Sequence, residues 1–323
     1  MTLRLAIAGV GHWHAPMHID AVRHAGAEVQ GVWDPDQAVT AAFAARHAAP
    51  PADSLPDLIA AWPDAIVVMG DPRDVPAMAR ACLAAGLPMV LEKPAAPTTA
   101  ALAALAPPAG HFIAVPLANR CSPVWPELAR LDAAGSLGPL VHAQFRIVNG
   151  VPDRYRADGV PWMLDPLVAG GGAMRNLGIH GIDAALMLFG AGEPELLSAA
   201  VRHHGHGEAV EEYAIATLAV PGGPVVTVEA GYTFASRAPG GDYEWRIAAT
   251  GATLIDRGTT CDVATLDDGA RRQIAPVPGR DRYRAFMAET LTLLRQGRPP
   301  SCGFADYLRA MRLIDRIYAE ARQ

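Results

Sequence analysis

The sequence predicts a protein of two domains: an α/β domain with a doubly wound parallel sheet, then an α+β domain with a large, mainly antiparallel open sheet. Over residues 1–118, short apolar runs alternate with helical segments, which is the pattern of a parallel sheet flanked by helices. From residue 196 onwards, strands follow one another through short turns, which favours antiparallel pairing. The 323 residues also exceed what one hydrophobic core usually serves. We therefore expect domains at 1–118 and 119–323.

In the first predicted domain, apolar runs mark strands, and the segments between them have the apolar spacing of helices. The expected strands cover residues 3–8, 28–33, 65–69, 88–91 and 112–115. The expected crossover helices, flanked by Pro or Gly, cover residues 15–24, 37–47, 75–85 and 99–105.

In the second predicted domain the pattern changes from alternation to a run of strands. It begins with a helix at 126–134, a strand at 141–148, a loop rich in Pro and Gly, and a helix that carries His180. The strands that follow are expected at 196–204, 213–220, 225–234, 243–249, 253–256 and 262–267. Two helices, at 281–296 and 304–322, are expected to close the chain.

Composition and charge argue against several classes of partner. The net charge of -6, without a concentrated basic face, removes the electrostatic case for nucleic acid. No stretch reaches the about 18 apolar residues of a membrane span, and the apolar run at 5–10 is too short for a signal peptide. The four cysteines lie far apart without a CxxC pair, unlike a zinc site or a disulfide framework. We expect a cytoplasmic protein with a small-molecule partner.

A glycine-rich turn opens the chain and predicts a dinucleotide site. Gly9 and Gly11 lie between a predicted strand and a predicted helix, where backbone N–H groups meet a pyrophosphate. His14 occupies the place of the third glycine of the usual G-x-G-x-x-G motif, and Ala15 follows it as a small residue for close packing. Asp34 ends the second strand, where it would bind a ribose 2′-hydroxyl and repel a 2′-phosphate. NAD is therefore favoured over NADP.

Three histidines and a tryptophan gather directly after these glycines: His12, Trp13, His14 and His18. A metal site is one interpretation, but no acidic or cysteine ligand with matching spacing lies nearby. The other is that His12, Trp13 and His14 line the loop that faces the nicotinamide and the substrate. We favour the second and expect no metal.

Two further motifs predict acid/base chemistry. Lys93, between Glu92 and Pro94, follows a strand end, where its ammonium group would polarise a substrate oxygen; the alternative is an ion pair with Glu92. Glycines at 170–172 precede a helix whose spacing would place Asn176, His180 and Asp183 on one face. His180 is the acid/base candidate, since imidazole titrates near neutral pH; the alternative is a histidine satisfied within the core.

With these motifs the chain resembles the glucose-fructose oxidoreductase, inositol dehydrogenase and MocA (Gfo/Idh/MocA) family over nearly its whole length. The resemblance rests on the opening glycines, Asp34, the strand at 64–70 with Pro72, Glu92-Lys93-Pro94, Asn119-Arg120, the triple-glycine helix with His180 and Asp183, and the turn at 251–254. It implies a Rossmann domain, a larger sheet domain, and reversible oxidation of a hydroxyl on a sugar, cyclitol or similar polyol by NAD(P). Lys93 and His180 would lie at the reacting carbon. Family dehydrogenases usually carry aspartate four residues before the histidine, where this chain has Asn176.

The candidate residues fall into three groups. The catalytic candidates are Lys93, His180 and Asn176; the cofactor candidates are Gly9, Gly11, His12, Trp13, Asp34, Pro72, Glu92 and Lys93; the substrate candidates are Lys93, Arg120, Arg175, Asn176 and His180. Besides an NAD-dependent dehydrogenase, the sequence leaves open a lyase, epimerase or hydrolase that oxidises its substrate transiently on a retained NAD. A catalytically inactive nucleotide-binding regulator is a third possibility. We expect a homodimer or homotetramer.

Overall fold

The computed structural model describes residues 2–203, 205–238, 240–266, 269 and 271–321, and its contacts divide the chain into two compact units. The first unit comprises Met1–Pro116, Tyr155–Gly170 and Tyr283–Arg309. The second unit comprises Leu117–Arg154, Gly171–Arg282 and Ala310–Gln323. The chain thus passes between the units several times, and two segments that follow residue 118 in sequence belong with the first unit.

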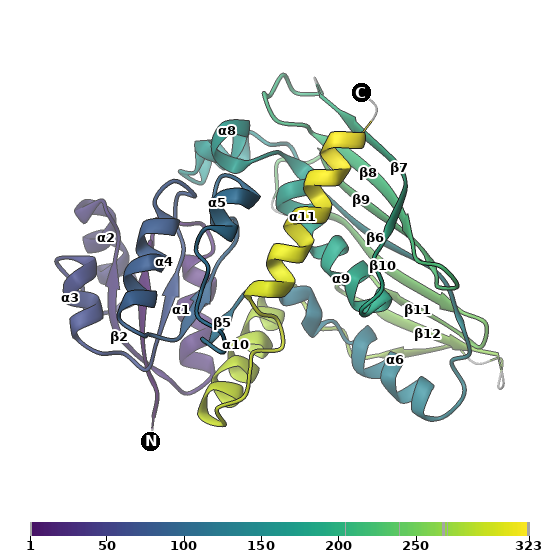
Figure 1. The fold of residues 1–323 in the computed structure, drawn as a ribbon, viewed down its shortest axis with the longest axis horizontal. Helices are drawn as coiled ribbons and strands as arrows, with labels where there is room; N and C mark the ends of the chain where they lie inside the picture. Colours follow the sequence, from purple (N-terminus) through teal and green to yellow (C-terminus); the bar gives the residue numbers. More distant parts are fainter. Residues whose placement is uncertain (1, 204, 239, 267–268, 270, 322–323) are drawn as a thin grey trace. The chain divides into compact units, whose positions relative to one another are not determined.

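The first unit contains a five-stranded sheet in which every pairing is parallel, so the predicted doubly wound sheet is confirmed (Figure 1). Its central strands are apolar and buried along their whole length, as expected where helices cover both faces. The strand order is β2-β1-β3-β4-β5, with bounds β1 Arg4–Ala8, β2 Glu28–Trp33, β3 Ala65–Val68, β4 Met89–Leu91 and β5 Ile113–Ala114.

Side-chain caps begin three of the helices around this sheet, because each cap satisfies a backbone N–H that has no partner within the helix. Asp36, Ser54 and Thr98 accept these bonds for α2, α3 and α5. The six-residue helix α3 was not predicted, although Ser54 and Pro56 give its start signal. The bounds are α1 Ala15–His24, α2 Gln37–His47, α3 Leu55–Ala60, α4 Val75–Ala84 and α5 Thr99–Ala103.

The later segment of the first unit, predicted as a loop, contains three short helical turns. They are α7 Arg154–Ala157, η2 Pro161–Leu164 and α8 Pro166–Ala169. Tyr155 is buried here against Trp13 of the opening turn, with ring centroids 6.0 Å apart.

The second unit contains an eight-stranded sheet in the order β13-β12-β11-β10-β6-β9-β8-β7 (Figure 1). Only β6 and β9 pair in parallel, so the predicted mainly antiparallel sheet is confirmed. Strand β13 was not predicted, and the predicted strand ends at residues 204 and 267 lie outside the described residues. The bounds are β6 Leu140–Gly150, β7 Glu195–Arg202, β8 Tyr213–Ala219, β9 Val225–Phe234, β10 Gly241–Ala249, β11 Ala252–Asp256, β12 Cys261–Thr265 and β13 Arg271–Ile274.

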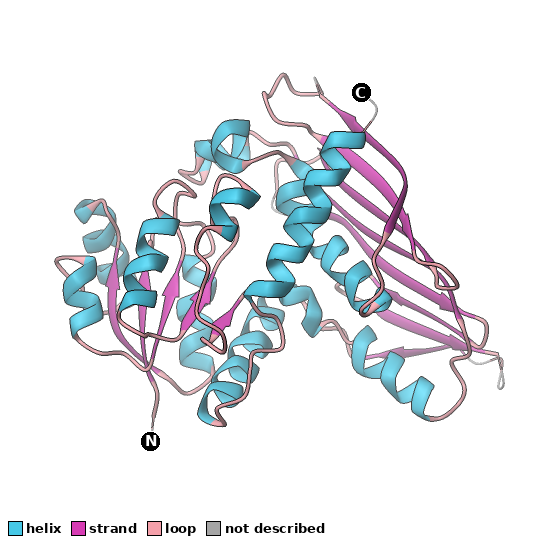
Figure 2. Ribbon diagram, viewed as in Figure 1, coloured by secondary structure: helices cyan, strands magenta, loops and turns pink. Residues whose placement is uncertain are grey.

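Helices cover one face of this sheet (Figures 1 and 2). Helix α9 approaches it closely at Gly181, where an added Cβ would lie 2.8 Å from the Val228 side chain and 3.0 Å from that of Phe145. The remaining elements are η1 Ala118–Cys121, α6 Val124–Ala133, the π-helix η3 Met174–Gly178, α9 Ile179–Phe189, α10 Gly279–Arg295 and α11 Phe304–Glu320. The predicted end of the last helix at 322 is not among the described residues. Within the described part of the chain, every helix is too short or too polar to cross a bilayer.

A buried ion pair fastens the second unit near the end of β11. Asp256 is fully buried. Its carboxylate accepts hydrogen bonds from Arg282 Nη2 at 2.5 Å, from Ser122 Oγ at 2.6 Å and from the Gly258 N–H at 2.7 Å. Arg282 also donates to Asn119 Oδ1 at 2.8 Å. These bonds connect β11 with η1 and with the start of α10.

Replacement of Asp256 by alanine is expected to lower the free energy of unfolding by about 3–5 kcal/mol, because the Arg282 guanidinium would stay buried without its counter-charge. Urea unfolding measures this loss. The matched control is Asp153→Ala, which breaks an ion pair with Arg237 whose side chains are 59% and 84% exposed. The control should change stability by less than about 0.5 kcal/mol. Equal effects of the two substitutions would contradict the assignment.

Candidate functional site

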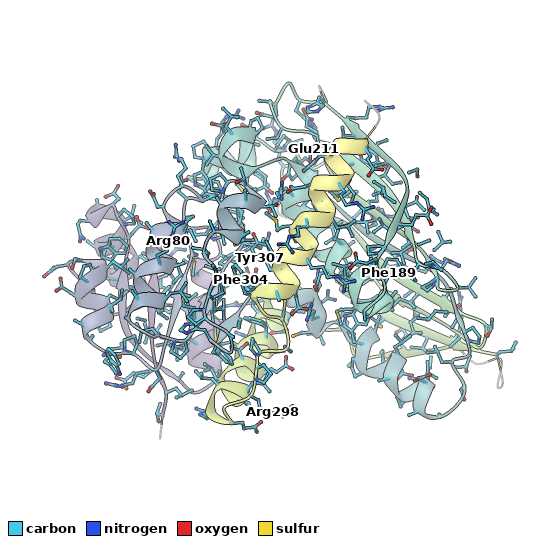
Figure 3. The ribbon with its side chains drawn as sticks, viewed as in Figure 1. Arg80, Phe189, Glu211, Arg298, Phe304 and Tyr307 are labelled. Atoms are coloured by element: carbon cyan, nitrogen blue, oxygen red, sulfur yellow. The ribbon has the colours of Figure 1, made fainter. Side chains whose placement is uncertain are left out.

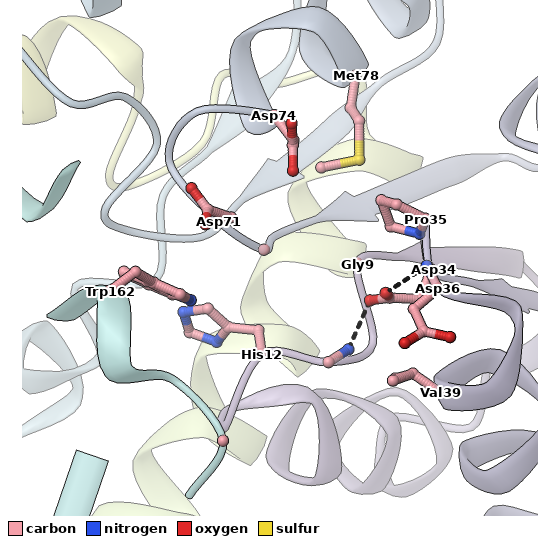
Figure 4. A pocket seen from close by; sticks show the side chains of 13 residues that line it. Gly9, His12, Asp34, Pro35, Asp36, Val39, Asp71, Asp74, Met78 and Trp162 are labelled. Carbon is pink, nitrogen blue, oxygen red and sulfur yellow. Dashed lines mark hydrogen bonds between the residues drawn. The ribbon is translucent and has the colours of Figure 1, made fainter. Parts of the chain in front are cut away.

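The glycine turn forms one wall of a pocket at the carboxyl ends of β1, β2 and β3. Gly9 has φ +83°, and a Cβ there would lie 1.7 Å from the Met69 carbonyl oxygen, so only glycine fits. The pocket has a volume of about 260 Å³, enough for part of a dinucleotide. Its lining is Gly9, Gly11, His12, Asp34, Pro35, Asp36, Val39, Gly70, Asp71, Asp74, Met78, Gly159 and Trp162 (Figure 4).

Asp34 is held at the pocket wall by backbone donors. Its Oδ2 accepts from the Gly11 N–H at 2.7 Å, and its Oδ1 accepts from the Asp36 N–H at 3.0 Å (Figure 4). Asp36, Asp71 and Asp74 line the same pocket. Four carboxylates therefore face this cavity, which favours a hydroxyl-bearing ligand and opposes an additional phosphate.

His12 lies in this pocket opposite Asp34 and is 3% exposed (Figure 4). Its ring stacks on Trp13, with centroids 3.9 Å apart and planes at 23°, and lies 6.1 Å from the Trp162 ring. The backbone N–H of His14 donates to His12 Nδ1 at 3.1 Å. Burial, reinforced by His14, lowers the pKa of His12 well below its ordinary value, so the imidazole is neutral at pH 7.

Glu92 is the centre of a buried network beside this turn. Its Oε2 lies 2.6 Å from His18 Nε2 and its Oε1 lies 3.3 Å from His14 Nδ1. Oε1 also accepts from the Lys93 N–H at 3.0 Å, and the Tyr283 hydroxyl lies 2.9 Å from His14 Nδ1. Burial opposes ionisation of Glu92, but His14 and His18 hold its pKa well below the ordinary value. The Glu92 carboxylate therefore interacts with groups of the protein itself. Glu92 does not line the pocket.

Lys93 follows this carboxylate after the end of β4 and is 3% exposed. It is the only lysine in the sequence, since all other side chains counted as Lys or Arg are arginine. A compact ammonium group and a planar guanidinium are not interchangeable, so the choice of lysine at this position is informative. The presence of a single lysine in the sequence is therefore a signal for this site.

The end of the triple-glycine segment, which lies in the second unit from Gly171 onwards, is held by another buried carboxylate, Glu211 (Figure 3). It accepts from the N–H groups of Gly172 at 2.5 Å and Met174 at 2.9 Å, and from the Tyr318 hydroxyl at 2.6 Å. A Cβ on Gly172 would lie 2.1 Å from the Glu211 carbonyl oxygen, so glycine is required for this approach. Burial raises the pKa of Glu211, although these three hydrogen bonds oppose the rise.

The helix that carries His180 begins as a π-helix, η3, and continues as the α-helix α9. The prediction of a single α-helical face with i, i+4 spacing therefore needs correction, because residues 174–178 follow the wider i→i+5 hydrogen-bond pattern. Asn176 is 4% exposed, and its Nδ2 donates to the Tyr232 hydroxyl at 3.0 Å. His180 is half-buried at the start of α9. Single π-turns are frequent at functional sites.

Both candidate substrate-binding arginines make ion pairs within the second unit. Arg120 forms a bidentate pair with Asp183, at 2.8 and 2.6 Å. Arg175 donates to Asp315 at 2.6 Å and contacts the Met311 sulfur at 3.2 Å. Both guanidinium groups are therefore engaged by carboxylates of the second unit, Asp183 and Asp315.

The structure brings four of the predicted cofactor residues, Gly9, Gly11, His12 and Asp34, to one pocket. Trp13, Pro72, Glu92 and Lys93 do not line it. The second unit holds Arg120, Arg175, Asn176 and His180. Sequence reasoning missed Gly159, Trp162, Tyr232, Tyr283 and Glu211, none of which lies in a recognisable motif.

Two family models match the sequence. The model described as the oxidoreductase family with an NAD-binding Rossmann fold matches residues 3–109. The model of the GFO/IDH/MocA C-terminal domain matches residues 125–255, and together the two cover more than half of the chain. A comparison with curated proteins gives no match.

Solved structures of similar fold span almost the whole chain. An oxidoreductase from Agrobacterium radiobacter, in complex with NAD+, L-tartaric acid and magnesium, has a TM-score of 0.84 at 17% identity, covering 99% of this chain and 96% of the other. A levoglucosan dehydrogenase with NADH and levoglucosan has a TM-score of 0.83 at 17% identity, covering 99% and 97%. A UDP-N-acetylglucosamine 3-dehydrogenase from Acidithiobacillus ferrooxidans has a TM-score of 0.79 at 21% identity, covering 99% and 98%.

Replacement of Glu92 by glutamine is expected to lower the free energy of unfolding by about 1.5–3 kcal/mol at pH 7, because the charged hydrogen bonds to His14 and His18 are lost. The native pKa of Glu92 lies below the unfolded value of about 4.3, so its contribution is present above that pH and is lost as the pH falls through the native pKa. The gap between wild type and variant should therefore close in acid.

Urea unfolding between neutral and acidic pH measures this gap. The control is Glu289→Gln, which changes an exposed glutamate. A gap that stays constant with pH, or a variant as stable as wild type at pH 7, would contradict the role of the Glu92 charge.

Proposed function

Because the chain belongs to the GFO/IDH/MocA family of oxidoreductases, with an NAD-binding Rossmann domain, we propose that it is an NAD-dependent dehydrogenase of a sugar, cyclitol or related polyol. The observation that carries the cofactor assignment is Asp34, fixed by the Gly11 N–H at the carboxyl edge of the parallel sheet. The substrate class rests on the family resemblance that the Lys93 and His180 motifs carry, and it is supported by the sugar dehydrogenases among the similar solved structures. A cytoplasmic location, inferred from the cysteine spacing, is part of this proposal.

The residues of the first unit fit NAD better than NADP. The Asp34 carboxylate would accept hydrogen bonds from the ribose hydroxyls, while Asp36, Asp71 and Asp74 add negative charge to the same cavity. A 2′-phosphate would bring its own negative charge among these groups. NAD, when bound, supplies the acceptor for the hydride that leaves the hydroxyl-bearing carbon.

The protein's own residues would handle the proton and the substrate oxygen. Lys93 would donate a hydrogen bond to the reacting oxygen and stabilise its developing negative charge. His180 would take the hydroxyl proton and, in the reverse reaction, return it. The Asn176 amide, oriented by Tyr232, would position a substrate hydroxyl through its carbonyl oxygen. We assign Arg120 and Arg175 to the framework, since carboxylates engage their guanidinium groups.

Asn176 is also the observation that favours a second candidate. An amide cannot supply charge to a neighbouring imidazolium or relay a proton as a carboxylate does. A lyase, epimerase or hydrolase that keeps its NAD and oxidises the substrate only transiently is therefore the alternative. Such an enzyme would turn over without net accumulation of NADH, whereas a dehydrogenase would accumulate it. An inactive nucleotide-binding regulator would bind NAD and convert none of the polyols.

Assembly into homodimers or homotetramers remains part of the proposal. The face of the large sheet opposite the buried residues Phe145 and Val228 carries half-buried side chains such as Gln144, Arg146 and Thr227. A broad half-buried sheet face of this kind is a suitable surface for a second copy.

Replacement of Asp34 by asparagine is expected to shift the ratio of NADP to NAD affinity about tenfold towards NADP, equivalent to roughly 1.4 kcal/mol. Asparagine keeps an oxygen for the Gly11 N–H but removes the charge that repels a 2′-phosphate. Isothermal titration calorimetry with both dinucleotides measures the ratio. An unchanged ratio would remove Asp34 as the selecting residue.

Replacement of Lys93 by alanine or arginine, or of His180 by asparagine, is expected to lower kcat about 10²–10⁴-fold on any polyol that supports NADH formation. Arginine keeps the charge but not the compact ammonium group, so it should not restore turnover. The measurement is NADH absorbance over a panel of sugars, cyclitols and sugar acids. Glu289→Gln is the control, and full turnover by a Lys93 or His180 variant would overturn its assigned role.

A further inference from the structure

The imidazole of His12, a residue that lines the nucleotide pocket, carries a hydrogen-bond donor. Its Nδ1 accepts the His14 N–H at 3.1 Å, so this nitrogen carries no proton. The ring is neutral, because burial lowers its pKa well below the ordinary range. A neutral imidazole with a bare Nδ1 must carry its proton on Nε2.

The Nε2–H group has no protein partner among the described residues, although the atom is buried. A buried donor left without an acceptor costs about 1–3 kcal/mol, so an unmatched group of this kind calls for a missing partner. His12 lines the same pocket as Gly9, Gly11 and Asp34 (Figure 4). A ligand bound in this pocket would supply that acceptor.

The ring is also fixed before any ligand arrives. Trp13 stacks on it at 3.9 Å, and the Trp13 ring itself lies 5.6 Å from Trp162 and 6.0 Å from Tyr155. Together with the His14 bond, this packing restricts rotation of the imidazole. A donor held in one direction binds its acceptor with little loss of conformational entropy.

We propose that His12 Nε2–H donates a hydrogen bond to an oxygen of the bound dinucleotide, and we assign that oxygen to the pyrophosphate. The assignment follows from position: His12 is the residue directly after Gly11, in the turn between β1 and α1, where folds of this kind receive the pyrophosphate. This inference rests on the proposed NAD site and adds a side-chain contact to it.

The test compares two amides at position 12. In His12→Asn the amide oxygen can still accept the His14 N–H, but no group reaches the place of Nε2. In His12→Gln the longer amide can place an N–H near that point. We expect the Kd for NAD to rise about ten- to hundredfold in His12→Asn and to stay within about threefold of wild type in His12→Gln, as for loss and recovery of a hydrogen bond to a charged group.

Isothermal titration calorimetry gives these constants without turnover, and quenching of Trp13 and Trp162 fluorescence gives an independent reading. His24→Asn, at an exposed histidine, is the control, and thermal unfolding shows whether each variant is folded. NAD affinity in His12→Asn within twofold of wild type would overturn the inference. Absence of NAD binding by the wild-type protein would instead overturn the proposed function.

Titration with ADP-ribose separates the two ends of the dinucleotide, since it has the pyrophosphate but lacks the nicotinamide. An equal loss of affinity for ADP-ribose and NAD in His12→Asn supports the pyrophosphate assignment. A loss seen with NAD alone would overturn it and place the acceptor at the nicotinamide end.

Discussion

In each unit a buried carboxylate accepts hydrogen bonds from glycine backbone, and the candidate site residues are placed by that contact. Asp34 accepts from the Gly11 N–H in the first unit, and Glu211 accepts from the Gly172 N–H in the second. Close approach is possible because glycine has no Cβ: a Cβ on Gly11 would lie 3.0 Å from Asp34 Oδ2, and one on Gly172 would lie 2.8 Å from Glu211 Oε2. The position of each carboxylate therefore requires a glycine beside it, and the glycine N–H in turn fixes the carboxylate.

A third carboxylate, Glu92, extends this principle to the histidine-rich turn. Through His18 and His14 it connects the start of α1 with the end of β4, so one buried charge fixes both the cofactor turn and the backbone of Lys93. A buried charge is stable only when its hydrogen bonds are complete, and here two imidazoles and a backbone N–H complete them. His14 and His18 thus stabilise the buried Glu92 carboxylate. In the described part of the chain, no cluster of histidine, cysteine and carboxylate groups is suited to a metal ion.

The sequence was sufficient for features that local patterns determine and insufficient for those that depend on distant segments. The strands of both sheets and the turn with Gly9, Gly11 and Asp34 follow from apolar periodicity and glycine placement. Trp162 reaches the same pocket from a segment more than a hundred residues away, and no local signal reports such a contact. The π-helix at residues 174–178 could not be predicted either, because apolar spacing and helix propensity do not distinguish i→i+5 from i→i+4 hydrogen bonding.

The burial of residue 176 gives a physical reason for an asparagine at this position. This position is 4% exposed and faces the Tyr232 hydroxyl, so an aspartate here would place an ionised group in a largely desolvated environment. The amide avoids that cost and reverses the hydrogen bond, because asparagine donates to Tyr232 where a carboxylate would accept from it. Proton transfer in the proposed reaction then depends on His180, and Lys93 stabilises the charge on the reacting oxygen. The lone lysine of a chain otherwise built with arginine is consistent with that role, since an ammonium group is a compact point charge and a guanidinium is a planar fork.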